Sequence, residues 1–127
     1  MSPPNDLEHS HFELAINLSH ELGHQALMIY QGADRILVND LNMPVYSVIR
    51  KTMRPAIWSF HAVVAIAFML KFVSDLMKSP LSESDRDYLN NKKRDLMTSL
   101  VQGITTCERL NFTELGNRLF KECRTLA

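Results

Sequence analysis

The chain has 127 residues, 46% of them hydrophobic, which is enough for the core of one ordinary domain and argues against wholesale disorder. Fourteen basic and fourteen acidic side chains cancel, so the charge pattern gives no support for nucleic-acid binding or for a polybasic membrane patch. The start of the chain lacks a basic stretch followed by an apolar run, so we expect no signal peptide. Two widely separated cysteines, in no metal-binding pattern, predict reduced thiols in a cytoplasmic protein.

The first predicted element is a long amphipathic helix that runs to about Tyr30 and ends at Gly32. Asn5 or Asp6 is the expected N-terminal cap. Apolar residues recur along this stretch at helical spacing, which is the evidence for the helix: Leu7, Leu14, Leu18, Leu22 and Ile29.

This helix contains an HExxH motif at residues 20–24. Residues four apart lie one above the other on a helix, so His20 and His24 direct two imidazoles to one point, with Glu21 beside them. Two nitrogens and a nearby carboxylate suit a divalent metal. The alternative is that both histidines are ordinary solvated residues. Gly23 between them costs helix stability, which indicates close packing or ligand access.

From Ala33 to Met53 the helical pattern breaks, and we expect one long irregular loop, with a short strand or hairpin fragment in it. Residues 35–38 are the strand candidate, while Pro44 prevents a long strand. A loop of this length in a compact domain is usually functional.

Pro55 suits the first turn of a second helix, which we expect to run to about Lys78. This helix is apolar almost all round, which predicts the central position in the fold. Its most apolar stretch, residues 56–70, is shorter than a bilayer requires and contains His61. A buried core helix is therefore favoured over a membrane span.

Two further helices complete the predicted fold. Ser82, with Asp85 three residues later, resembles a capping box and opens a third helix that runs to about Arg109. Asn111 or Thr113 opens a short fourth helix. The fold class is therefore predicted as all-α: residues 1–127 form a single metal-binding domain, a bundle of about four helices with one long irregular loop between the first two.

A third metal ligand is needed, because two histidines rarely hold a catalytic metal alone. The extended zinc-peptidase motif HExxHxxGxxH is absent, since Leu27 and Tyr30 stand at its last two positions, and no glutamate occurs between His24 and Glu83. His61 is the remaining candidate, because a polar ring in an apolar helix needs a partner. A core histidine bonded to a carbonyl or hydroxyl is the plainer interpretation.

A basic cluster precedes His61 and suggests an anionic co-substrate beside the metal. Arg54 lies seven residues before His61, about two helical turns, where a guanidinium can pair with a carboxylate. Arg50 lies just upstream, and Tyr46 and Ser47 can donate hydrogen bonds to a co-substrate, although a role at the loop surface is equally expected.

The motifs together resemble a known family. The order HExxH, then Tyr46-Ser47-x-x-Arg50-x-x-x-Arg54-Pro55, then Phe60-His61-Ala62 in an apolar helix, is similar to the HExxH-type 2-oxoglutarate-dependent peptide β-hydroxylases, also described as an HExxH-motif peptide-modification family. The later sequence Leu110-x-x-Thr113-x-x-Gly116 resembles the C-terminal part of that group. The likeness extends from about Leu14 onward, and the chain resembles a short member that consists of the family's core alone.

The resemblance implies a non-haem iron(II) enzyme that uses 2-oxoglutarate and oxygen to hydroxylate a peptide or an amino-acid-derived substrate in a biosynthetic pathway. On this interpretation His20, His24 and His61 bind iron, and Arg54 or Arg50 pairs with the distal carboxylate of 2-oxoglutarate. Glu21 orients a ligand or a bound water, or is itself a ligand. Three histidines differ from the usual set of two histidines and one carboxylate, so zinc stays open as the metal.

Two other functions remain in competition with the oxygenase. One is a minimal zinc hydrolase in which Glu21 is the general base for a metal-bound water. The other is a non-catalytic helical module that binds a partner protein. Besides a small-molecule or peptide substrate, the expected partners are a second copy of the chain or a biosynthetic partner protein, with no nucleic acid and no membrane.

Overall fold

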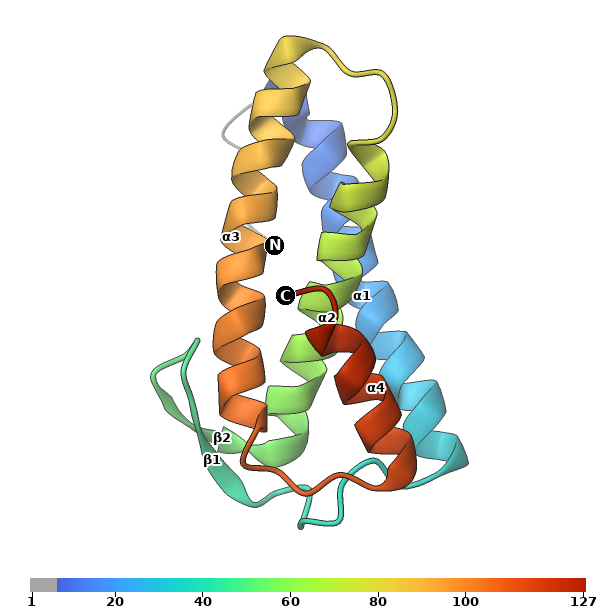
Figure 1. The fold of residues 1–127 in the computed structure, drawn as a ribbon, viewed down its shortest axis with the longest axis vertical. Helices are drawn as coiled ribbons and strands as arrows, with labels where there is room; N and C mark the ends of the chain where they lie inside the picture. The colour runs from blue at the N-terminus through green and yellow to red at the C-terminus, as the bar shows by residue number, and fades with distance from the viewer. Residues whose placement is uncertain (1–6) are drawn as a thin grey trace.

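The structure is a computed structural model that describes residues 7–127, so the predicted cap at Asn5 or Asp6 lies outside the described residues. Within that range the elements are four α-helices, one turn of 3-10 helix (η1, Leu7–His9) and one two-stranded sheet. Figure 1 shows the long helices α1, α2 and α3 side by side along the long axis, with α4 against the lower half and the hairpin at the lower end. The predicted all-α bundle of about four helices is confirmed.

Helix α1 (Ser10–Ala33) buries a face that consists partly of small residues: Phe12, Ile16, Ser19, Gly23 and Leu27. A Cβ on Gly23 would lie 2.8 Å from the Cα of Ala65, so the two helix backbones are in direct contact at this point. The close packing indicated by Gly23 is therefore confirmed. The leucines whose spacing predicted the helix do not lie on this buried face, since Leu18 and Leu22 are 57% and 61% exposed.

Helix α2 (Ala56–Leu76) is the central element, as its composition predicted, and it packs against both α1 and α3. Most of its side chains are buried, from Ala56 to Val73. Among the described residues it is the one helix long and apolar enough to cross a membrane, with a mean hydropathy of 1.9, but 61% of that window is buried inside the bundle. This burial is typical of the core helix of a small helical protein.

The connection between α1 and α2 contains an antiparallel hairpin, β1 (Pro44–Ser47) and β2 (Thr52–Pro55). Lys51 has a φ of 56° in the turn between them. The strand candidate at 35–38 forms only a single bridge, between Leu37 and Phe112. The hairpin therefore lies later in the chain than the predicted strand at 35–38. Pro44, which was expected to prevent a long strand, is the first residue of the short strand β1.

Helices α3 (Glu83–Cys107) and α4 (Glu114–Arg124) begin at capping residues that the sequence indicated. The Ser82 side chain accepts a hydrogen bond from the Asp85 backbone N–H at 3.1 Å, and Thr113 accepts one from Gly116 at 3.1 Å. The Thr113 hydroxyl also donates to the carbonyl of Arg35. The start of α4 is thus attached to the chain that leaves α1.

Candidate metal centre on the first two helices

His24 and His61 face each other across the α1–α2 interface. Their Nδ1 atoms lie 3.1 Å apart and their rings are nearly stacked, at 27°. His61 is 4% exposed and His24 is partly buried. The sequence therefore identified two histidines, 37 residues apart, that the fold brings into contact.

Gln31 fixes the hydrogen-bonding state of His61. Its side-chain oxygen lies 2.9 Å from His61 Nε2, and an amide oxygen only accepts, so Nε2 carries the proton and donates. Nδ1 of His61 then has a lone pair directed at His24. An outer partner that sets the tautomer in this way is the usual companion of a metal-binding histidine.

Burial favours the neutral form of both imidazoles. Desolvation, together with the neighbouring His24, lowers the pKa of His61 to about 4. Desolvation and the nearby His20 also lower the pKa of His24, against a smaller opposing effect of Glu21. The neutral form is the one that binds metal.

His20 and Glu21 lie at the edge of this pair. The His20 ring packs edge-on against His24 at 4.6 Å between centroids, and its Nδ1 lies 3.3 Å from Glu21 Oε1. In the part of the chain that the structure describes, the three histidines are not a group whose ligand atoms all lie within 4.8 Å of one another. His20, with 38% of its side chain exposed, has to rotate before it can act as a third ligand.

Three of the four predicted co-substrate residues lie together on a different face of α2. Arg50, Arg54 and Ser47 line a cavity of about 20 Å³, enough for roughly one water, against Gly103 and Thr106 of α3. Ser59 also lines it, and successive helical residues are about 100° apart, so Ser59 and His61 project from nearly opposite sides of α2. The expected alignment of Arg54 with His61 is wrong, because Arg54 belongs to β2 and not to the helix.

Ser59 is a residue that the sequence did not single out. Among the described residues, its Oγ is the one buried side-chain polar atom without a hydrogen-bond partner, and it lines the cavity that Arg50 and Arg54 share. Ser47 is buried as well, and its hydroxyl accepts from the Arg50 backbone at 3.1 Å. Tyr46 alternates to the other side of β1 and lines a separate surface hollow with Met53.

Gln31 was also missed, although a signal for it exists. It lies seven residues after His24, about two turns along the same helix, and so on nearly the same face. A polar residue in that register of an HExxH helix is a candidate for the outer partner of a ligand. Trp58 is a second neighbour, tilted at 37° with its centroid 5.1 Å from that of His61.

The fold and this site together define a small helical protein with paired histidines between its first two helices. Comparison with models of protein families finds no family that matches the chain, and comparison with curated proteins finds no match.

Proposed function

We propose that the chain is a metal-dependent oxygenase of the iron(II) and 2-oxoglutarate class, acting in the cytoplasm on a peptide or small-molecule substrate. The observation that carries the proposal is the contact between the Nδ1 atoms of His24 and His61 at 3.1 Å. Ligand nitrogens about 2.0–2.1 Å from an ion are roughly 2.9 Å apart in an octahedral site and roughly 3.3 Å apart in a tetrahedral one, so the pair lies between the separations that iron and zinc need. The residues therefore fit a divalent metal.

In this proposal three histidine side chains hold the ion, and a fourth side chain orients one of those histidines. His24 and His61 would hold the ion through Nδ1, Gln31 holds the His61 ring through its Nε2–H, and His20 would turn inward to be the third ligand. Iron, when bound, supplies the oxygen chemistry that an unactivated carbon requires. Zinc is the alternative metal for the same donors.

The Arg50–Arg54 cavity supports a carboxylate-binding role. Arg50 and Arg54 line this small space together with Ser59, whose hydroxyl has no hydrogen-bond partner. Arginine and hydroxyl groups are donors that suit a carboxylate oxygen. The cavity is too small for a whole dicarboxylate and lies on the α3 side of α2. The oxygenase therefore requires the β1–β2 hairpin, which carries both arginines, to shift when the co-substrate binds.

Conversion of 2-oxoglutarate to succinate, with and without added iron(II), tests the proposal. We expect iron-dependent turnover that His24→Ala abolishes and that Arg54→Met weakens mainly through the KM for 2-oxoglutarate. Gln31→Ala should weaken iron binding by about 10–100-fold, the usual cost of losing an outer partner. His11→Ala and Gln25→Ala, both at exposed positions of α1, are the matched controls.

Two outcomes would reject the oxygenase. One is the absence of metal-dependent 2-oxoglutarate binding, measured by calorimetry with iron(II) or manganese(II). The other is a number of bound iron(II) ions per chain that His24→Ala and His61→Ala leave unchanged.

A zinc hydrolase is the second candidate, favoured by the contact between the Glu21 carboxylate and His20 Nδ1 at 3.3 Å. A carboxylate beside a metal ligand is positioned to accept a proton from a metal-bound water. Glu21→Gln separates the two functions. It abolishes a zinc-dependent hydrolysis, whereas it leaves the stoichiometry of 2-oxoglutarate binding unchanged.

A further inference from the structure

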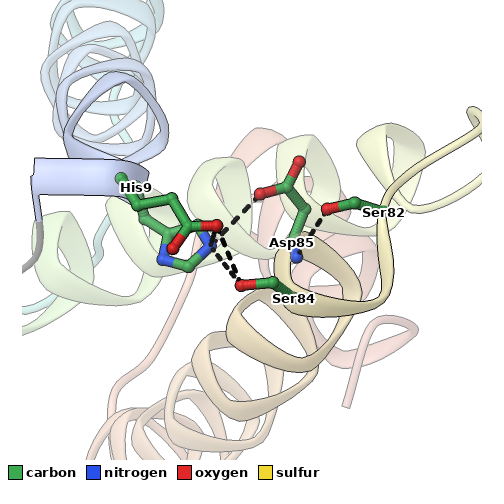
Figure 2. Close-up of polar contacts among 5 residues, drawn as sticks. His9, Ser82, Ser84 and Asp85 are labelled. Atoms are coloured by element: carbon green, nitrogen blue, oxygen red, sulfur yellow. Dashed lines mark hydrogen bonds and ion pairs between the residues drawn. The ribbon is translucent and has the colours of Figure 1, made fainter.

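We propose that Glu8, His9 and Asp85 form a second divalent-cation site, at the opposite end of the bundle from the hairpin. In the described part of the chain these three are the one group of histidine, cysteine or carboxylate side chains whose ligand atoms all lie within 4.8 Å of one another. They come from η1 and from the first turn of α3, and Figure 2 shows His9 and Asp85 directed toward each other across these elements.

The spacing of the donor atoms suits a shared ion. His9 Nε2 lies 3.2 Å from Asp85 Oδ1 and 4.0 Å from Glu8 Oε1. Ligands about 2.0–2.1 Å from a tetrahedral ion are roughly 3.3 Å apart, so a small movement of the exposed Glu8 side chain completes three corners of a coordination sphere.

The surroundings hold the imidazole in place. His9 is 4% exposed, and its ring stacks on Tyr88 at 4.4 Å between centroids and 8° between planes. The Ser84 hydroxyl donates to Glu8 Oε1 at 3.0 Å and lies 3.5 Å from His9 Nε2. A fixed ring and an oriented carboxylate are what an outer coordination shell provides.

The donor set suits a divalent cation. Glu8 and Asp85 each bring a carboxylate to the buried imidazole of His9. One imidazole with two carboxylates suits zinc, manganese, iron or cobalt rather than a soft copper(I) ion.

A metal here would connect distant parts of the chain. His9 and Asp85 are far apart in sequence, with α1 and α2 between them, so the ion would close a long loop from the start of the chain to α3. An ion that binds the folded chain and not the unfolded chain stabilises the fold. We therefore assign the site a structural role, separate from the histidines of the α1–α2 interface.

The test isolates the new site in a His20→Ala/His24→Ala background, where the α1–α2 centre is removed. Cobalt(II) is added to the metal-free full chain, and binding is followed by visible absorption and by calorimetry. We expect one cobalt per chain, displaced by zinc, and an increase in melting temperature on binding.

Asp85→Asn and Glu8→Gln should each weaken binding by at least about tenfold, since loss of an outer partner alone typically costs that much. His11→Ala and Asp87→Asn, neighbouring residues of the same types at exposed positions, should leave it unchanged. Far-UV circular dichroism checks that each variant is folded. Glu8→Gln changes an exposed side chain, so it is expected to leave the fold intact.

Absence of cobalt binding in the background chain would overturn the site. Binding that Asp85→Asn and Glu8→Gln leave intact would do the same, and His9 and Asp85 would then be an ordinary ion pair between η1 and α3.

Discussion

At the scale of single residues, the hydrogen side chain of Gly23 sets the separation of α1 and α2. The nearest atoms to a Cβ at this position are backbone atoms, the Ala65 Cα at 2.8 Å and the Val64 carbonyl oxygen at 3.2 Å. Backbone cannot move aside as a flexible side chain can. The residue after Gly23 is His24, so the same close approach brings that ring to His61.

Gly23→Ala should therefore destabilise the fold by about 1–3 kcal/mol, the usual cost of overpacking, although alanine is the better helix former. Gly32→Ala is the matched control, because nothing lies within 4 Å of a Cβ there. It should be neutral or stabilise by up to about 1 kcal/mol. Urea unfolding followed by circular dichroism measures both, and equal effects at the two positions would show that α1 and α2 are not in backbone contact.

At the scale of the helix, α1 has two apolar faces with different roles. The face with Leu27, which is 1% exposed, packs on the bundle, whereas Leu14, Leu18 and Leu22 form an exposed stripe. Periodicity finds both faces and cannot rank them. The small residues Ser19 and Gly23 determine which face packs on the bundle, since they allow the closer contact with α2.

Leu27→Ala should cost about 2–5 kcal/mol of stability, as buried leucines do. Leu22→Ala, on the exposed stripe, should change stability by no more than about 0.5 kcal/mol. The same urea titration compares the two variants at low protein concentration. A large loss for Leu22→Ala would mean that another surface covers the stripe in solution.

The starts of α3 and α4 were predictable from capping chemistry, as Ser82 and Thr113 show. The start of α1 was not, because its N-cap is His9, whose side chain makes no capping hydrogen bond. The position of the hairpin was not, because its strands are short and begin and end at prolines, Pro44 and Pro55. The pairing of His24 with His61 followed from a motif plus one polar ring in an apolar helix. The predicted alignment of Arg54 with His61 was wrong, since Arg54 lies in a strand and the direction of its side chain depends on the hairpin and not on helical spacing.

At the scale of the whole molecule, both thiols are buried where helices meet. Cys107 is fully buried and Cys123 is 7% exposed. Burial, with the neighbouring Cys123, raises the pKa of Cys107 to about 12, and burial, with Glu122, raises that of Cys123 to about 11. Both cysteines are free, in agreement with the expectation of reduced thiols.

The folded chain should therefore resist alkylation. At pH 8 a thiol with a pKa of about 11 is ionised to only about 0.1%, and the thiolate is the reactive form. Cys123 lines a largely apolar cavity of about 510 Å³ between α4 and the first two helices, so we expect it to react before Cys107. Mass spectrometry of Cys107→Ser and Cys123→Ser chains treated with iodoacetamide measures the two rates. Rapid reaction of Cys107 in the folded chain would contradict the core position of α3.

The Leu37–Phe112 bridge has a consequence for how the molecule opens. The Thr113 N–H donates to the Ile36 carbonyl at 2.9 Å, and the Val38 N–H donates to the Asn111 carbonyl at 2.8 Å. The segment at 36–38, which follows α1, is therefore hydrogen-bonded to the segment at 111–113, which leads into α4. Detachment of α4 must break these bonds, so amide hydrogens at 38 and 113 should exchange together, as one cooperative unit.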